Sequence, residues 1–440
     1  MVLTGTSAIQ PNGHLHIGGV DAVSLAKEYG TPLYVYDVAH MREQARAFKQ
    51  AFEQRGVDGQ VAYASKAFSC LAMVQIMNEE GLNLDVVSGG ELYTALQAGF
   101  PAENIHFHGN NKSYAEIEMA VNAGVGCFIA DNFYELSLLK RAAAKTGRTL
   151  PVLLRTTPGI KAQTHDYIAT GQEDSKFGFD LESGQLFDAL SDVLANDAFD
   201  CLGLHCHIGS QIFDTGRFRA AIEKMYAELE RRFDELRFVP KVLNLGGGFG
   251  IRYVSGDTPK PAEHFVESMI DTVVSESERL GFSVPEIWIE PGRAIAGSAG
   301  TTLYTVGSQK DIPNIRKYIA VDGGMADNLR PALYQAQYEG ILANRGLDPK
   351  KETVSVAGKC CETGDMLIWD LRLPEVKPDD LLAVFCTGAY GYAMANNYNR
   401  LPRPAVVFVE DGDAQVVVKR ETYEDLVKRD VPLKKQSIVP

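Results

Sequence analysis

The sequence lacks an excess of basic residues and any long apolar run. Lysine and arginine number 43 against 57 aspartates and glutamates, which gives a net charge of −14. A protein that binds nucleic acid or an anionic membrane surface needs a basic patch. No stretch of the chain approaches the roughly 18 apolar residues that span a bilayer. These absences argue against nucleic acid and membrane lipid as main partners and favour a small molecule.

Cysteine is scarce and irregularly placed. An odd number without a repeated spacing does not describe the disulfide framework of a secreted protein. Residues 1–13 contain no basic segment followed by an apolar one, so we expect no signal peptide and a cytoplasmic location. The seven cysteines are Cys70, Cys127, Cys201, Cys206, Cys360, Cys361 and Cys386.

The usual nucleotide and zinc motifs are also missing. The chain has no Walker A motif, and its glycines do not fit the GxGxxG pattern. His205 and His207 stand two apart, and Cys360 and Cys361 are adjacent. Neither spacing is that of a standard zinc site, because adjacent cysteines cannot easily chelate one tetrahedral ion. We therefore predict no metal.

What is present is ordinary globular composition over a long chain. The 440 residues are 45% hydrophobic and 23% charged, which suits a protein with a large buried core and no need of disulfides. This length predicts two to three domains.

From about residue 60 to residue 295, short apolar strands alternate with polar turns and helical segments. This alternation predicts parallel βαβ units. The strands number eight, as in a (β/α)₈ barrel, although periodicity leaves an open doubly wound sheet as the alternative. The predicted strands are residues 61–65, 84–87, 105–108, 127–130, 152–155, 202–207, 242–245 and 287–290.

The pattern changes after residue 297 to short β-rich segments separated by turn residues, and residues 1–37 have a similar character. Such segments are typical of antiparallel sheet. We therefore predict an α/β fold in two domains. Residues 38–296 form the (β/α)₈ TIM barrel, and residues 1–37 with 297–440 form a mostly antiparallel β domain.

Unusual residues follow five of the predicted strands, at the end where such a barrel carries its active site. A lysine at a barrel mouth, here Lys66, can be desolvated and form a Schiff base. Taken alone, a lysine at a strand end is more often simply solvated. The five segments are residues 64–66, 88–90, 205–210, 246–250 and 290–293.

Three consecutive glycines, Gly246–Gly248, allow backbone N–H groups to approach an anion closely. Ser210 and the amides around Gly292 and Arg293 add donors, so we favour a phosphate site over a plain tight turn. Glu290 ends an apolar strand and needs a cationic partner, either Arg293 or a protonated pyridine nitrogen. A lysine, a phosphate cradle and an acid together describe a pyridoxal-phosphate site.

A series of segments matches one family in order along the chain. They are residues 63–67, 85–91, 175–178, 205–211, 244–251, 290–295, 321–325, 361–362 and 388–392. Through them the chain resembles the fold-type III pyridoxal-phosphate decarboxylases, specifically the branch that acts on diaminopimelate. The resemblance implies an alanine-racemase-like barrel with a C-terminal β domain and pyridoxal 5'-phosphate as cofactor. It also implies conversion of meso-2,6-diaminopimelate to L-lysine and CO₂, the last step of lysine biosynthesis.

By this resemblance Lys66 would hold the cofactor as a Schiff base, with Asp85 as the acid beside it. His207 would stack on the cofactor ring, and Glu290 would keep the pyridine nitrogen protonated. The other cofactor contacts would come from Ser210, Gly248, Pro291, Gly292, Arg293 and Tyr390.

The resemblance also implies a substrate group and a partner. Cys361 would donate the proton and Glu362 would recognise the distal amine of the substrate, both from the partner subunit. The active sites would then be shared within a homodimer. The residues that hold the substrate in addition would be Arg293, Arg330, Tyr334 and Tyr390.

The chain departs from the family pattern at two places. Lys359 and Cys360 precede Cys361 where Gly-Pro is usual, so we choose Cys361 over Cys360 because it directly precedes Glu362. Thr157 precedes Pro158 where Asn is frequent. A decarboxylase for arginine, ornithine or a carboxylated polyamine is the alternative enzyme. A non-catalytic pyridoxal-phosphate carrier is the alternative of another class, and it would leave residues 297–440 without a purpose.

Overall fold

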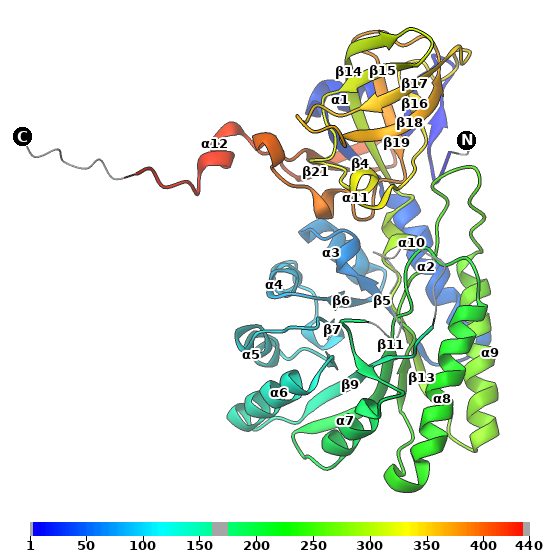
Figure 1. The fold of residues 1–440 in the computed structure, drawn as a ribbon, viewed down its shortest axis with the longest axis vertical. Helices are drawn as coiled ribbons and strands as arrows, with labels where there is room; N and C mark the ends of the chain where they lie inside the picture. Colours follow the sequence, from blue (N-terminus) through cyan, green and yellow to red (C-terminus); the bar gives the residue numbers. More distant parts are fainter. Residues whose placement is uncertain (1–2, 161–174, 434–440) are drawn as a thin grey trace, which may run out of the picture. The chain divides into compact units, whose positions relative to one another are not determined.

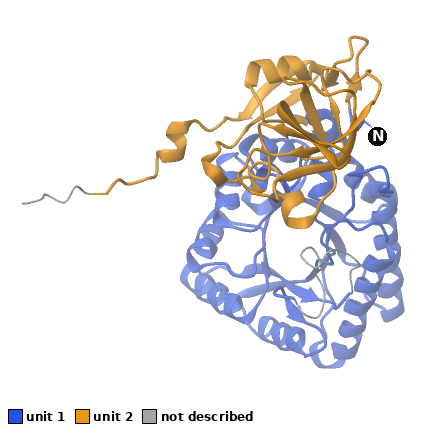
Figure 2. Ribbon diagram, turned by 45° about the horizontal axis from the view of Figure 1, so that its top comes forward, with its two compact units in different colours: residues 1–5, 37–300, 388–393 blue, residues 6–36, 301–387, 394–440 orange. Residues whose placement is uncertain are grey.

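The computed structural model describes residues 3–160 and 175–433, and the chain divides into two compact units (Figure 2). Among the described residues, unit 1 comprises 3–5, 37–160, 175–300 and 388–393, and unit 2 comprises 6–36, 301–387 and 394–433. Residues 388–393 thus belong to unit 1, whereas the sequence pattern groups them with the β domain.

Unit 1 is built on a closed barrel of eight parallel strands, so the predicted fold class is confirmed. Closure comes from the pairing of β8 with β9, in which Ala130 lies opposite Leu154. An open doubly wound sheet is excluded by this pairing. The barrel strands are β5 (Gly59–Ala64), β6 (Asn83–Val86), β7 (Ile105–Phe107), β8 (Cys127–Ala130), β9 (Leu150–Thr157), β11 (Phe199–Cys206), β12 (Val242–Asn244) and β13 (Glu286–Ile289), with the short β10 (Phe179–Asp180) added beside β9.

Helices surround these strands (Figure 1). Their ends carry conventional signals: Ser113 and Glu116 form a capping box on α5, and Gly281 ends α9 in the left-handed conformation. The helices are α2 (Val38–Arg55), α3 (Leu71–Glu79), α4 (Gly89–Gln97), α5 (Tyr114–Ala123), α6 (Phe133–Thr146), α7 (Gln185–Leu194), α8 (Gly216–Leu236), α9 (Ala262–Leu280) and α10 (Arg293–Ala296), with 3₁₀ turns η1 (Ser65–Ala67) and η2 (Ala102–Asn104).

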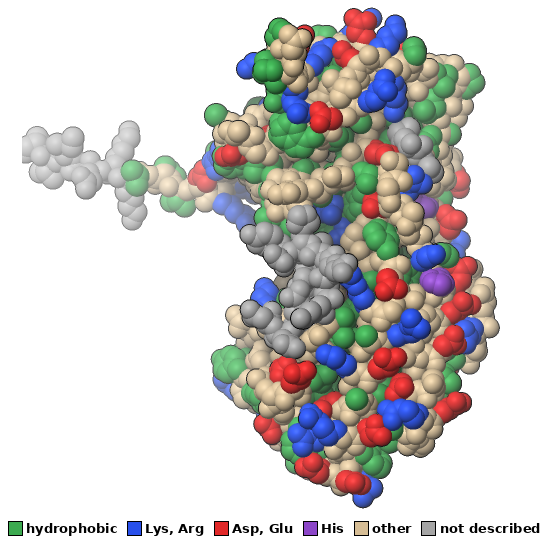
Figure 3. All heavy atoms as spheres, turned by 45° about the vertical axis from the view of Figure 1, so that its right-hand side comes forward, with side chains coloured by type: hydrophobic (Ala, Val, Ile, Leu, Met, Phe, Trp, Pro, Cys, Tyr) green, Lys and Arg blue, Asp and Glu red, His purple; other side chains and the backbone are tan. Residues whose placement is uncertain are grey.

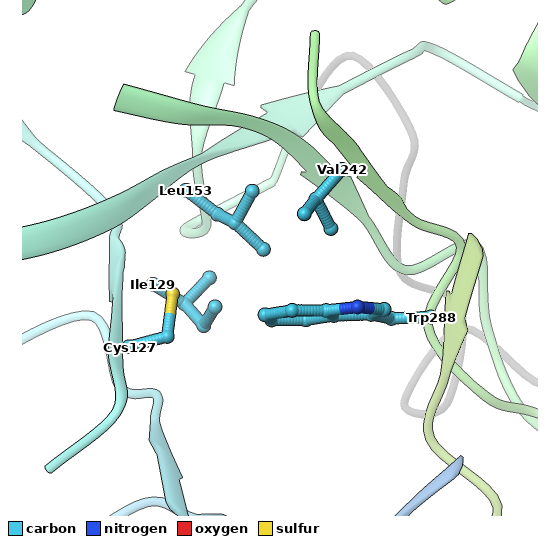
Figure 4. Packing of buried hydrophobic residues seen from close by; sticks show 5 residues of the cluster. All are labelled: Cys127, Ile129, Leu153, Val242 and Trp288. Carbon is cyan, nitrogen blue, oxygen red and sulfur yellow. The ribbon is translucent and has the colours of Figure 1, made fainter. Parts of the chain in front are cut away.

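The barrel interior is apolar below its mouth. Trp288 faces a buried cluster of aliphatic and thiol side chains (Figure 4), and its ring stacks on His106 at 4.3 Å between centroids. Alternate residues of a strand point to the same side. Glu290, two residues after Trp288, and His108, two after His106, therefore face inward one layer nearer the carboxyl ends of the strands.

Unit 2 contains a mostly antiparallel sheet, as predicted, with β15 and β17 as a parallel pair. The path runs β18-β17-β15-β14-β4-β20-β21, and β19 joins β14 to β16. The strands are β4 (Leu33–Asp37), β14 (Gly300–Ile312), β15 (Arg316–Val321), β16 (Gly340–Leu342), β17 (Glu352–Ala357), β18 (Met366–Leu373), β19 (Leu381–Phe385), β20 (Ala405–Glu410) and β21 (Asp413–Val418).

Smaller elements complete unit 2. A separate three-stranded sheet near the N-terminus precedes helix α1, and two short helices lie later in the chain. These elements are β1 (Ala8–Ile9), β2 (Leu15–Ile17), β3 (Val20–Asp21), α1 (Ala22–Tyr29), α11 (Arg330–Tyr334) and α12 (Tyr423–Val427), with the 3₁₀ turn η4 (Tyr398–Arg400). The 3₁₀ turn η3 (Tyr392–Met394) spans the boundary between the last segment of unit 1 and unit 2.

The surface of unit 1 carries charged side chains of both signs (Figure 3). On the face shown in Figure 3, acidic and basic side chains are interspersed over the helical part of unit 1. Arg279 of α9, for example, pairs with Glu230 of α8 at 2.8 Å. Within residues 3–160 and 175–433, no helix has both the length and the apolar character needed to cross a membrane.

Candidate active site

Lys66 and Asp85 come together because their strands are neighbours in the barrel. Ala64 at the end of β5 lies opposite Asp85 on β6, and Lys66 follows in η1 with an exposed side chain between buried neighbours. Burial raises the pKa of Asp85 to about 6; the charge of Glu290 adds to this, and His108 and Lys66 oppose it. The pair places an amine beside an acid that titrates near neutrality.

Glu290 is a buried carboxylate held by three side chains. Oε1 accepts a hydrogen bond from Nδ2 of Asn244 at 2.7 Å and lies 2.9 Å from Nε2 of His108. Oε2 lies 3.2 Å from Nε2 of His205. Burial alone would raise the pKa of Glu290, but the imidazoles of His108 and His205 hold it well below its usual value. The structure therefore keeps an ionised acid at the barrel mouth.

His207 follows β11 and presents a neutral ring. Burial lowers its pKa well below the usual value, and the cations Lys66 and Arg155 lower it further. Its Nδ1 accepts a hydrogen bond from the backbone N–H of Gly247 at 3.3 Å. This places the remaining ring proton on Nε2. A flat, uncharged imidazole held from one edge can stack on an aromatic ring.

The glycine run after β12 approaches neighbouring backbone too closely for any other residue. A Cβ on Gly247 would lie 2.1 Å from the carbonyl oxygen of Glu290, and one on Gly248 would lie 2.3 Å from that of Gly209. Gly248 also has a φ of +109°. Glycine is required there because both the space and the conformation exclude a side chain. The loop thus brings the backbone of Gly248 next to the segment that carries Ser210, while the N–H groups of Gly246 and Gly247 are bound by Asn244 and His207.

Arg293 supplies a buried cation beside that loop. Its Nη2 donates to Oγ of Ser210 at 2.8 Å, and its Nη1 donates to the hydroxyl of Tyr253. The guanidinium lies 4.8 Å from the ring centroid of Tyr390, whose backbone N–H is anchored on the carbonyl of Ala67 at 2.8 Å. A hydroxyl, a guanidinium and glycine amides together fit a phosphate group.

Gly292 brings this anion site close to the lysine. A Cβ on Gly292 would lie 3.0 Å from Cβ of Ala64 and 3.1 Å from that of Ala67. Pro291 accepts a hydrogen bond from the N–H of Ala64 at 3.2 Å through its carbonyl oxygen. Lys66 stands between Ala64 and Ala67, so the amine and the phosphate donors share one rim of the barrel.

The remaining predicted residues belong to unit 2. Cys361 and Glu362 are exposed, whereas Cys360 is buried and its backbone N–H donates to Asp365 at 2.8 Å. Burial raises the pKa of the Cys360 thiol to about 12, and the charge of Asp365 raises it further.

Besides Glu362, two substrate-binding residues predicted in unit 2 lie on α11. Arg330 is buried and donates to the hydroxyl of Tyr338 at 2.5 Å, while Tyr334 is half-buried. The structure therefore brings the predicted cofactor residues together in unit 1, which also carries Arg293 and Tyr390, whereas unit 2 carries the predicted proton donor and the other substrate residues.

Sequence reasoning missed His108 and Asn244 as site residues. Both lie at the carboxyl end of a correctly predicted strand. This position alone could have indicated that they belong to the site, because barrel active sites lie at these strand ends. The ligand atoms of His108, His205 and Glu290 lie within 4.8 Å of one another, a spacing that would also accept a metal ion. The zinc set weighed from the sequence differs from this trio, since Cys360 and Cys361 belong to unit 2.

Comparison with known proteins identifies the family. Residues 38–297 match the family model of the pyridoxal-dependent decarboxylase, pyridoxal binding domain. The diaminopimelate decarboxylase of Bacillus subtilis is 64% identical over 99% of both chains. That of Staphylococcus aureus is 47% identical over 95% of this chain and 98% of its own.

Solved structures agree. The diaminopimelate decarboxylase of M. jannaschii in complex with L-lysine superposes with a TM-score of 0.91 at 35% identity, over 97% of this chain and 98% of the other. The Helicobacter pylori enzyme complexed with L-lysine gives a TM-score of 0.83 at 30% identity, over 92% and 98%.

The residues of unit 1 fit pyridoxal 5'-phosphate, the cofactor of this family. The glycine loop leaves a cradle that a Cβ would fill, the ionised Glu290 suits a pyridinium, and Lys66 offers an amine between them. The chain therefore belongs to the pyridoxal-dependent decarboxylases and, among them, to the diaminopimelate decarboxylase family.

Proposed function

We propose that the protein converts meso-2,6-diaminopimelate to L-lysine and CO₂, the last step of lysine biosynthesis. The observation that carries the proposal is the Glu290 network. This network maintains an ionised carboxylate at the barrel mouth, which also carries Lys66 and the glycine loop. The chain is 64% identical to a diaminopimelate decarboxylase over 99% of its length. When bound, the cofactor draws off the electrons that departing CO₂ leaves on carbon.

We assign the cofactor contacts to residues of unit 1. Lys66 would bind the cofactor covalently through its amine. Asp85 is the acid beside this amine. Glu290 holds a proton at the pyridine nitrogen, because an ionised carboxylate stabilises a facing cation. His207 stacks on the ring as a neutral imidazole.

We propose that hydrogen-bond donors in the loops after β11, β12 and β13 bind the phosphate group of the cofactor. Gly248 and Gly292 keep the backbone open there, and Arg293, held by Ser210, supplies the positive charge. Tyr390 covers the guanidinium and limits the access of water.

We assign proton donation to unit 2 and substrate recognition to residues of unit 2 together with Arg293 of unit 1. Cys361 donates the proton that replaces CO₂, since an exposed thiol can serve as a general acid. Glu362 binds the distal ammonium group of the substrate. Arg293, Arg330 and Tyr334 bind its carboxylates.

We further propose that Cys361 and Glu362 serve the active site of a partner subunit in a homodimer. Their exposure in one chain supports this, because a donor that reaches a second chain must lie on the surface of the first. The homodimer and the cytoplasmic location remain predictions.

The proposal is tested with purified protein, pyridoxal 5'-phosphate and meso-diaminopimelate, following lysine by chromatography together with released CO₂. We expect lysine and CO₂ in equal amounts and no product from ornithine or arginine. Lys66→Ala is the matched control and should lose both turnover and the visible absorbance of the lysine-bound cofactor. Turnover of ornithine or arginine in place of diaminopimelate would overturn the substrate assignment.

A further inference from the structure

His108 stands between the two carboxylates of the cofactor site. Its Nε2 lies 2.9 Å from Oε1 of Glu290 and 3.7 Å from Oδ1 of Asp85. Neither Asp85 Oδ1 nor His108 Nε2 makes a well-directed hydrogen bond to any residue that the structure describes, so the contact between His108 and Glu290 is one of short distance and charge. An imidazole nitrogen that faces two acceptors must carry a hydrogen, because an unprotonated nitrogen would be repelled by both.

The backbone holds His108 rigidly in this place. Its N–H donates to the carbonyl of Val86, the neighbour of Asp85, at 2.8 Å. Its ring meets that of His205 edge to face, with 5.0 Å between centroids. The side chain is only 4% exposed. The ring therefore has little freedom to turn away from Glu290.

The carboxylates of Asp85 and Glu290 lie close enough for their charges to repel each other. Asp85 and Glu290 are both buried, and the charge of Glu290 raises the pKa of Asp85 while His108 opposes that effect. Two like charges in a buried site repel each other strongly unless a donor or a cation stands between them. His108 is the side chain in contact with both.

We propose that His108 is a positioning residue, whose imidazole, with Nε2 close to both carboxylates, keeps the Glu290 carboxylate towards the cofactor and separates its charge from that of Asp85. The inference rests on the proposed role of Glu290 at the pyridine nitrogen. His108 acts through Glu290 and does not itself touch the cofactor. Without it, Glu290 shares a buried site with an uncompensated second acid and loses one of its three side-chain partners.

His106 provides a matched control on the same strand. It is equally buried and also points into the barrel, but its contacts are the ring of Trp288 at 4.3 Å and Nδ2 of Asn83 at 3.2 Å. A substitution at His106 thus disturbs interior packing and leaves the Glu290 partners in place. Gln at position 108 keeps an N–H donor, and Phe keeps the ring and loses the donor.

The experiment uses holoprotein loaded with pyridoxal 5'-phosphate labelled with ¹⁵N in the ring. The ring-nitrogen chemical shift reports protonation at that atom, independently of turnover. We expect His108→Phe to move this shift towards that of an unprotonated pyridine and to lower kcat about tenfold with little change in KM, as loss of one polar contact to a buried carboxylate predicts. His108→Gln should recover most of both values, and His106→Phe should leave the shift unchanged.

Three results would overturn the inference. One is an unchanged ¹⁵N shift in His108→Phe. Another is an equal shift in His106→Phe, which would make the effect one of packing. The third is one equivalent of bound metal in the purified holoprotein that disappears in His108→Phe, which would make His108 a metal ligand. Failure of the wild-type protein to turn over diaminopimelate would contradict the proposed substrate alone, because the shift is measured without substrate.

Discussion

Asn244 Nδ2 donates a hydrogen bond of 2.7 Å to Glu290 Oε1, and the Oδ1 of the same amide accepts the backbone N–H of Gly246 at 2.9 Å. One side chain thereby ties the acid of β13 to the first residue of the glycine loop. The side-chain amide of Asn244 therefore positions both the Glu290 carboxylate and the start of the glycine loop.

Asn244→Ala should weaken both functions of this amide. A hydrogen bond to a charged group contributes about 1.5–3 kcal/mol, so we expect turnover to fall roughly tenfold to a hundredfold, with weaker binding of pyridoxal 5'-phosphate. Steady-state kinetics and cofactor titration measure the two effects. Wild-type values for both in a correctly folded variant would refute the link.

Gly248→Ala should abolish tight cofactor binding, because its Cβ would meet the carbonyl oxygen of Gly209 at 2.3 Å and its φ is +109°. We expect the dissociation constant of pyridoxal 5'-phosphate to rise about fivefold to a hundredfold, since backbone strain of this kind amounts to about 1–3 kcal/mol. Gly256→Ala is the control, because a Cβ on Gly256 meets nothing within 4 Å. Equal affinities of the two variants for pyridoxal 5'-phosphate would contradict the assignment of Gly248 to the phosphate site.

Cys361→Ala should lower kcat by about a hundredfold while cofactor stays bound, as expected when a general acid is removed. Cys360→Ala should change kcat far less, because the Cys360 thiol is buried and its pKa is raised to about 12. Turnover and cofactor absorbance are measured together on both variants. A larger loss in Cys360→Ala would reverse the choice of proton donor.

Asp85 should make the stability of the cofactor-free protein depend on pH. Its pKa is raised from 3.8 to about 6 in the folded chain, so folding favours the protonated form. The associated stability is present below pH 3.8 and is lost as the pH rises through about 6. Asp85→Asn stays neutral and avoids this loss, so its advantage over the wild type should grow to about 3 kcal/mol by neutral pH.

Denaturant unfolding of both cofactor-free proteins across this pH range measures the difference. An advantage of Asp85→Asn that stays constant from low to neutral pH would show that desolvation of the Asp85 charge is not its source.

The residues that local chemistry governs could be read from the sequence. Apolar runs of strand length located all eight barrel strands, because a parallel strand covered on both faces must be apolar throughout. Lys66 and the glycine run stood out since they interrupt such runs at the strand ends. The motif-based assignments of Glu290 and His207 likewise needed only their neighbours in the chain.

The partners of those residues depended on the tertiary structure. His108, His205 and Asn244 meet on Glu290 because the barrel brings the carboxyl ends of β7, β11, β12 and β13 together at its mouth, and no spacing along the chain encodes that meeting. The exposure of Cys361 beside the buried Cys360 was likewise decided by the loop around Asp365. The sequence by itself determined which groups could react. Only the closed barrel decided which of them share a buried site, because burial and charge separation are properties of contacts between distant segments.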